Sequence, residues 1–160
     1  MLNFIHGQLN ERKGALMMKY VLLVSHGNFA QGIHSVLDMM AGKGRNDILS
    51  TSLKDGMSIE TFGEKVKDLV KDIKEDDKVI LLGDIIGGSP LTATLNVLNE
   101  KGILKNTIAF GGANVSCALN ALLMKDALET NELKETLISE SRESIQELEL
   151  NTCDGCDDDI

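Results

Sequence analysis

The strongest constraint on the fold is a repeated pattern: short apolar runs, each followed by a segment with helical periodicity. Tyr20–Ser25 and Val79–Gly83 are apolar almost throughout, which is typical of strands that are buried on both faces of a parallel sheet. Two further strands are expected at Ile48–Leu53 and Thr107–Phe110. We therefore predict an α/β fold, a single doubly wound domain with a central, mainly parallel sheet and helices on both faces.

The helices are marked by their spacing and their ends. The first is expected to bury four residues that recur at helical spacing: Ile33, Val36, Leu37 and Met40. Ser58 is expected to cap a second helix, and Ser89 a third with Pro90 at its first helical position. Two last helices are expected at about Cys117–Leu128 and Glu132–Glu149, the latter burying Leu133, Leu137, Ile145 and Leu148.

The two ends of the chain differ from its middle. Residues 1–17 are polar and lack a period, so we expect an N-terminal extension outside the fold, a domain over 18–150 and an acidic tail over 151–160. Cys153 and Cys156 form a lone C-x-x-C in that tail, and without further ligands we interpret them as free thiols. With no secretory signal and no apolar run long enough to span a bilayer, a cytoplasmic protein is expected.

The overall charge excludes one class of partner. The net charge is −9 and the isoelectric point is about 4.8. Such a surface repels the phosphates of DNA and RNA, so we expect no nucleic-acid partner. A basic protein partner would suit the charge.

One histidine and one aspartate stand where a parallel sheet places its ligands. His26 follows the first strand and Asp84 follows the third, and the carboxyl ends of parallel strands meet at one edge. A neutral imidazole can act as a nucleophile, and a carboxylate that accepts a hydrogen bond from Nδ1–H would leave Nε2 exposed. Taken singly, such a histidine is more often structural, and such an aspartate often caps a turn.

Gly87, Gly88 and Ser89 come directly after this aspartate. Glycines allow backbone to approach a ligand closely, and free N–H groups at a helix start bind anions. We expect these residues to hold a phosphoryl group carried by His26. Phosphoryl transfer depends mainly on positioning and charge stabilisation, so no cofactor and no metal are expected.

Taken together, these motifs resemble one known family. Ser25-His26-Gly27 with Phe29 and Gly32, then Gly56-Met57-Ser58, then Gly83 to Pro90, are similar to the IIA domain of the mannose-family phosphotransferase systems (PTS). The similarity covers about Met18 to Leu128. It departs at Ile86, where the family usually has an aromatic residue, and at Asn114-Val115-Ser116-Cys117, where the family usually has Asn-x-Pro-Met.

The resemblance implies a function and partners. His26 would accept phosphate from the carrier protein HPr and pass it to an EIIB component, for a sugar that enters through membrane EIIC and EIID partners. Asp84 would be the partner of the histidine. A homodimer is also implied, often with an exchanged C-terminal strand. Since no IIB domain follows, a stand-alone IIA subunit is expected.

Three other functions compete with this interpretation. A histidine phosphatase also places His-Gly at a strand end, but it needs an arginine where Ser25 stands and basic residues around the phosphate. A phosphorylation-dependent regulatory module and the carrier subunit of a dihydroxyacetone kinase would have the same site. His34 lies inside the first predicted helix and is interpreted as a surface or boundary residue.

Overall fold

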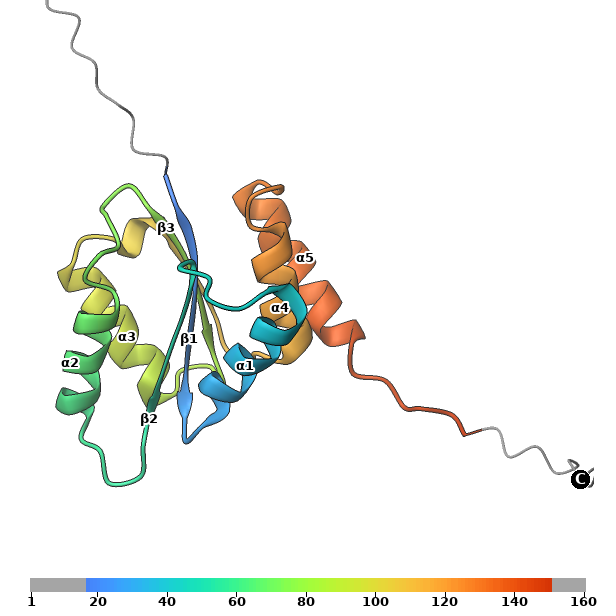
Figure 1. The fold of residues 1–160 in the computed structure, drawn as a ribbon, viewed down its shortest axis with the longest axis horizontal. Coiled ribbons are helices and arrows are strands. Elements are labelled where there is room, and N and C mark those ends of the chain that lie inside the picture. The colour runs from blue at the N-terminus through green and yellow to red at the C-terminus, as the bar shows by residue number, and fades with distance from the viewer. Residues whose placement is uncertain (1–16, 151–160) are drawn as a thin grey trace, which may run out of the picture.

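The computed structural model describes residues 17–150, in which four strands alternate with helices (Figure 1). The strands are β1 (Lys19–His26), β2 (Ile48–Leu53), β3 (Lys78–Gly83) and β4 (Thr107–Phe110). The helices are α1 (Phe29–Ala41), α2 (Ile59–Leu69), α3 (Ser89–Glu100), the short 3₁₀ helix η1 (Leu104–Asn106), α4 (Val115–Met124) and α5 (Thr130–Glu143). The C-x-x-C of the acidic tail lies outside the described residues.

The strands form one parallel sheet in the order β2-β1-β3-β4. The register pairs His26 at the end of β1 with Leu53 at the end of β2, and Val24 with Gly83 at the end of β3. All four carboxyl ends therefore lie at one edge of the sheet. The predicted doubly wound α/β fold is confirmed.

Helices cover both faces of the sheet, with α2 and α3 on one face and α1, α4 and α5 on the other (Figure 1). Alternate residues of β1 supply the two cores: Val21 and Leu23 pack with α1, α4 and α5, while Leu22 and Val24 pack with α2 and α3. This division explains the continuous apolar run, because a strand covered on both faces needs an apolar side chain at every position.

The last helix is shorter than its periodicity predicts. It ends at Glu143 rather than Glu149, and Ile145 and Leu148 are each 81% exposed. The hydroxyl of Ser141 donates to the carbonyl of Leu137, and that of Ser144 donates to the carbonyl of Ser141 (2.8 Å). Serine side chains that bind nearby backbone compete with helical hydrogen bonding. This competition explains why α5 ends although the helical spacing of apolar residues continues beyond it.

The fourth helix starts two residues earlier than expected, at Val115. The side chain of Asn114 accepts a hydrogen bond from the Cys117 N–H (2.7 Å) and caps the helix. An asparagine cap satisfies a backbone donor that the helix leaves free. The segment from Asn114 to Cys117, where the sequence departs from the family pattern, is thus the start of a helix.

A buried ion pair joins the α1–β2 loop to the end of α4. Lys125 is 3% exposed, and its Nζ lies 3.1 Å from Oδ2 of Asp47 and 2.7 Å from Oδ2 of Asp126. Burial acts to raise the pKa of Asp47, but hydrogen bonds from Arg45 and Lys125 outweigh it and hold that pKa below its usual value. The charge of Lys125 is therefore compensated inside the fold.

None of the helices in residues 17–150 is both long enough and apolar enough to cross a lipid bilayer.

Candidate functional site

His26 is the last residue of β1, and the chain turns away directly after it. Gly27 takes a left-handed conformation (φ +60°), and its N–H donates to the carbonyl of Leu53 (2.9 Å). Glycine adopts this conformation without steric cost. The turn leaves the side chain of His26 42% exposed at the carboxyl edge of the sheet.

The structure brings His26 and Asp84 together, as the topology predicts. Oδ2 of Asp84 lies 2.9 Å from Nδ1 of the His26 ring and also accepts the backbone N–H of His26 (2.9 Å). Oδ1 accepts the N–H of Ile85 (2.9 Å). A carboxylate only accepts hydrogen bonds, so Nδ1 must carry a proton. In the neutral ring, the lone pair is then on Nε2.

The hydrogen bonds keep Asp84 charged. Partial burial acts to raise the pKa of its carboxyl group, but the hydrogen bonds from the backbone and ring of His26, with that from Ile85, outweigh burial and lower the pKa. The carboxylate is therefore ionised at neutral pH. It can also stabilise positive charge that develops on the ring when Nε2 forms a bond.

The segment Gly87 to Ser89 lies beside the ring, but its donors differ from the prediction. The N–H of Gly88 donates to the carbonyl of Ile85 (3.1 Å) and is not a free donor. Helix α3 begins at Ser89 with Gly88 as its N-cap, one residue earlier than predicted. The N–H of Ser89 has no hydrogen-bond partner within residues 17–150, and it remains the candidate donor to an anion.

Gly88 makes close contact with the histidine possible. A Cβ on Gly88 would lie 3.2 Å from Cε1 of His26 and 3.1 Å from the carbonyl oxygen of Ile85. Gly87 adopts a left-handed conformation (φ +70°) in the same turn. The two glycines are therefore needed for different reasons: Gly87 allows the tight turn, and Gly88 allows the backbone to lie close to the His26 ring.

The loop after β4 supports the segment that carries Asp84. The N–H of Gly112 donates to the carbonyl of Asp84 (3.1 Å), and that of Ala113 donates to the carbonyl of Gly83 (3.0 Å). A Cβ on Gly111 would lie 2.3 Å from Cα of Ile86. This backbone-to-backbone approach leaves no room for any side chain at Gly111.

A buried polar group fixes the other side of the histidine loop. Ser25 is fully buried, and its Oγ accepts the N–H of Ala30 (2.8 Å) and lies 2.9 Å from Oγ of Ser52. The hydroxyl of Ser52 in turn donates to Oε1 of Gln31 (2.5 Å). These bonds attach the first turn of α1 to the ends of β1 and β2. Ser25 therefore has a structural role beside the histidine.

Lys54 is a residue at this edge that the motifs do not indicate. It follows β2, and its Nζ donates to the carbonyl of Gly27 (2.9 Å) and to Oδ1 of Asn28. No Lys or Arg occurs in the loops predicted to surround His26. This cation comes instead from the connection between β2 and α2, which the sequence analysis did not assign to the site. Its only signal in the sequence is its position directly after an edge strand of a parallel sheet.

His34 and Cys117 also have clear places in the structure. Nδ1 of His34 lies 2.7 Å from Oγ of Ser50, and its Nε2 lies 3.9 Å from Asp38, so His34 is a partly buried boundary residue. Cys117 is buried, and burial raises the pKa of its thiol. Within residues 17–150, no group of three or more His, Cys, Asp or Glu residues is arranged to hold a metal ion.

Comparisons with known proteins agree with this architecture. The family model EIIA-man, described as PTS system fructose IIA component, matches residues 20–138. The PTS system fructose-specific EIIA component of Bacillus subtilis (strain 168) is 28% identical over 126 residues, which cover 79% of this chain and 84% of that protein.

Solved structures give the same result. The PTS component EIIA of Streptococcus agalactiae matches with a TM-score of 0.69 and 27% identity, over 81% of this chain and 97% of that one. The mannose/sorbose-specific IIA subunit of Enterococcus faecalis matches with a TM-score of 0.70 and 19% identity, over 85% and 98%, and shows the shared fold. Because the family match spans most of its length, the chain belongs to the EIIA-man family of PTS components.

Proposed function

We propose that this protein is a phosphoryl carrier that takes phosphate from phospho-HPr on Nε2 of His26 and passes it to an EIIB component. The observation that carries the proposal is the 2.9 Å contact between Nδ1 of His26 and Oδ2 of Asp84 on a half-exposed imidazole. A ring held in this way has one protonated nitrogen and one free lone pair. Membership of the EIIA-man family supports phosphotransfer as the general role.

The transfer needs no group beyond the two proteins. The Nε2 lone pair forms a bond to the phosphorus of the donor's phosphohistidine, and the bond from that phosphorus to the donor nitrogen breaks. The proton on Nδ1 stays in place, and the ring gains positive charge that faces the Asp84 carboxylate. In this proposal the N–H of Ser89, at the start of α3, binds a phosphoryl oxygen and stabilises its negative charge. Transfer to EIIB reverses these steps on a new acceptor.

The surface around the histidine suits protein partners. Phe29, Ile85 and Ile86 are 46%, 55% and 75% exposed, and each lies within three residues of His26 or Asp84 in the sequence. Apolar side chains at the centre of an interface exclude water and supply much of its binding energy. We expect HPr and EIIB to use this surface in turn, in the cytoplasm, with EIIC and EIID reached only through EIIB.

Replacing His26 by alanine should abolish phosphorylation, whereas replacing His34 should leave it intact. The protein is incubated with phosphoenolpyruvate, enzyme I and HPr, and intact mass is measured at neutral pH. Wild type and His34→Ala should each gain one acid-labile phosphate, and His26→Ala should gain none. A phosphate retained in His26→Ala, or none on a folded wild type, would overturn the proposal.

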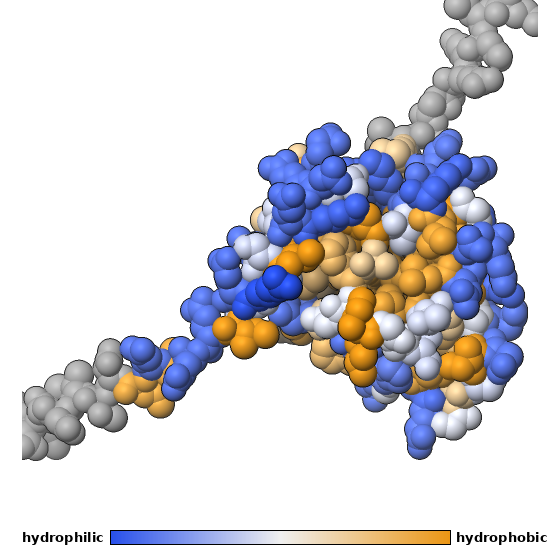
Figure 2. Space-filling model, turned by 180° about the vertical axis from the view of Figure 1, so that it is seen from behind, coloured by the Kyte–Doolittle hydropathy of each residue, from blue (hydrophilic) through white to orange (hydrophobic). Residues whose placement is uncertain are grey.

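We also propose a homodimer. Within residues 17–150, β4 pairs with β3 on one side and with no strand on the other. A cavity of about 400 Å³ adjoins this free edge and is lined by Ala109, Phe110, Ile138 and Ile145 among others, and Figure 2 shows apolar side chains gathered in a hollow on this face. Free strand edges and contiguous apolar patches are typical of interfaces.

The dimer can be tested on this surface. Sedimentation equilibrium should give twice the chain mass for the wild type, and Ile138→Asp should shift the mass toward the monomer because it buries a charge in the interface. The matched control is Leu123→Asp, at an apolar residue that is 61% exposed and does not line this cavity. A monomeric wild type would contradict the proposal.

A further inference from the structure

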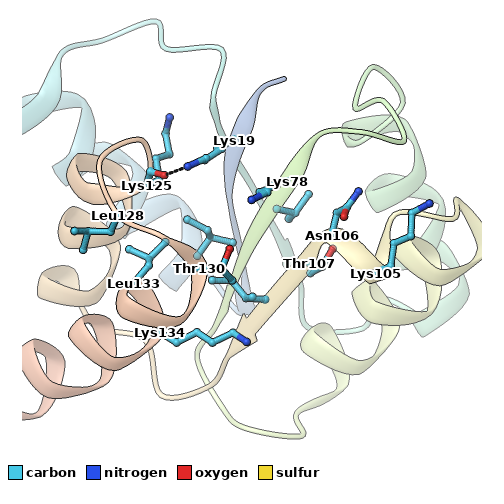
Figure 3. A pocket seen from close by; sticks show the side chains of 13 residues that line it. Lys19, Lys78, Lys105, Asn106, Thr107, Lys125, Leu128, Thr130, Leu133 and Lys134 are labelled. Atoms are coloured by element: carbon cyan, nitrogen blue, oxygen red, sulfur yellow. Dashed lines mark hydrogen bonds between the residues drawn. The ribbon is translucent and has the colours of Figure 1, made fainter. Parts of the chain in front are cut away.

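Lys54 is the first residue after β2, and it lies at the carboxyl edge of the sheet, where β1 ends at His26. Lysines of the two neighbouring strands lie at the opposite edge: Lys19 is the first residue of β1, and Lys78 is the first residue of β3. Figure 3 shows both beside a cavity at that end of the sheet. Lys54 therefore brings a cation to the edge at which phosphoryl transfer is proposed, and its contacts there indicate its role.

The turn that follows His26 depends on hydrogen bonds to keep its conformation. Gly27, Asn28 and Phe29 are all exposed. Gly27 takes the left-handed conformation (φ +60°), and a Cβ built on it would meet no atom within 4 Å. Glycine loses more conformational freedom on folding than any other residue. Because no side chain packs against this glycine, its backbone must be held by polar contacts.

The end of β2 supplies these contacts from two consecutive residues. The carbonyl of Leu53 accepts the N–H of Gly27 (2.9 Å), and Nζ of Lys54 donates to the carbonyl of Gly27 (2.9 Å) and to Oδ1 of Asn28. An ammonium group has three donors, so it can bind two acceptors at once. Within residues 17–150, no carboxylate oxygen lies within 4 Å of the Lys54 ammonium. No ion pair in this part of the chain therefore competes for its donors.

The side chain of Asn28 is available to Lys54 because it does not cap its own helix. Asn28 is the N-cap of α1, yet its side chain makes no capping hydrogen bond. An asparagine in this position normally accepts an N–H from the first turn of the helix. In this chain Oγ of Ser25 accepts the N–H of Ala30 (2.8 Å) instead. Asn28 thus connects the start of α1 to the end of β2 through the lysine.

We propose that Lys54 is a positioning residue for phosphoryl transfer: by holding Gly27 and Asn28, it fixes the backbone that carries the His26 ring against Asp84. This role rests on the proposed phosphorylation of His26, and it requires no contact between Lys54 and the phosphate. A displacement of about 1 Å at a reacting group can cost about a hundredfold in rate. A turn that samples other conformations lowers the fraction of molecules in which the ring is ready to react.

The kinetic test separates positioning of the histidine from docking of the partner. Lys54→Met, which removes the donors, should lower the limiting rate of phosphorylation about tenfold, because the ring is correctly placed for less of the time. The half-saturating concentration of phospho-HPr should change by less than about twofold, since docking is unchanged. Lys54→Arg, which keeps the charge and the donors, should restore the limiting rate to within about threefold of wild type. Rapid quench over a range of phospho-HPr concentrations gives both constants.

Lys101→Met is the matched control. Lys101 directly follows α3, and its Nζ donates to a backbone carbonyl in another segment, that of Lys71 (2.9 Å). It stands at the opposite end of α3 from Ser89, which lies near the histidine. The control removes the same kind of hydrogen bond far from His26, so both kinetic constants should keep their wild-type values.

Backbone relaxation NMR of the unphosphorylated chain tests the contact without a donor protein. In Lys54→Met, the order parameters of Gly27 and Asn28 should fall from about 0.85, the value of rigid backbone, toward the flexible range below about 0.6. Lys54→Arg and Lys101→Met should keep the wild-type order at this turn.

An unchanged limiting rate in Lys54→Met, or unchanged order at Gly27 and Asn28, would overturn the proposal. A higher half-saturating concentration at an unchanged limiting rate would place Lys54 on the docking surface of the partner and would equally contradict a positioning role. A folded wild type that takes no phosphate would instead remove the proposed function, and with it the role of Lys54 in the rate. The wild-type reaction therefore distinguishes the two failures.

Discussion

Asp84→Asn should slow phosphorylation of His26 by HPr by about a hundredfold to ten-thousandfold, as removal of the orienting carboxylate does in hydrolase triads. Oδ2 of Asp84 faces both Nδ1 and the backbone N–H of His26, whereas Oδ1 accepts the N–H of Ile85. Asparagine has one acceptor oxygen, and when this oxygen accepts the N–H of Ile85, the amide group takes the place of Oδ2 and faces Nδ1. That amide donates rather than accepts, so the proton moves to Nε2 and the nucleophilic lone pair is lost. The variant also loses the negative charge that stabilises the phosphorylated ring.

The rate is measured by rapid quench with phospho-HPr as donor. Asp38→Asn is the matched control, because Asp38 stands beside the other described histidine, 3.9 Å from Nε2 of His34. It should transfer phosphate at the wild-type rate. If Asp84→Asn also reacted at the wild-type rate, Asp84 would have no part in the mechanism.

Gly111→Ala should both destabilise the protein and reduce phosphoryl transfer more than tenfold. The added Cβ would lie 2.3 Å from Cα and 2.4 Å from N of Ile86, and backbone atoms cannot move aside as a flexible side chain does. The segment from Asp84 to Ser89 would have to shift, which changes the position of Asp84 relative to His26. Overpacking of this kind costs about 1–3 kcal/mol, and a shift of about 1 Å at a reacting group can cost a hundredfold in rate.

Gly32→Ala is the control for this substitution. Gly32 is the fourth residue of α1 and has open space around its Cα, so alanine there should leave the rate unchanged and raise stability by about 0.5–1 kcal/mol. Urea unfolding gives the stabilities. If Gly111→Ala retained wild-type stability and rate, the contact between the two loops would not position Asp84.

The apolar runs were sufficient to predict the sheet, because a strand buried on both faces allows few alternatives. Parallel connections then place His26 and Asp84 at the same edge, and this required no knowledge of side-chain contacts. The ends of helices were harder to predict. The apolar positions Ile145 and Leu148 continue the helical period, but serine hydroxyls end α5 before them.

Local hydrogen bonds limited the prediction of the site. Whether the N–H of Gly88 is free depends on the turn from Ile85, where the carbonyl already accepts it. Lys54 reaches the histidine loop only because β2 lies next to β1. Gly111 has an evident role only when the loop after β4 is seen against Ile86. Each feature depends on how segments distant in the chain lie against each other.

The central claim is that Asp84 holds Nδ1 of His26 and leaves Nε2 to carry the phosphate. The most direct measurement is isotope-edited NMR of the protein with labelled histidine after phosphorylation by phospho-HPr. The account predicts a phosphorus coupling to Nε2 of His26, with Nδ1 still protonated. Phosphate on Nδ1, or on any other residue, would contradict it.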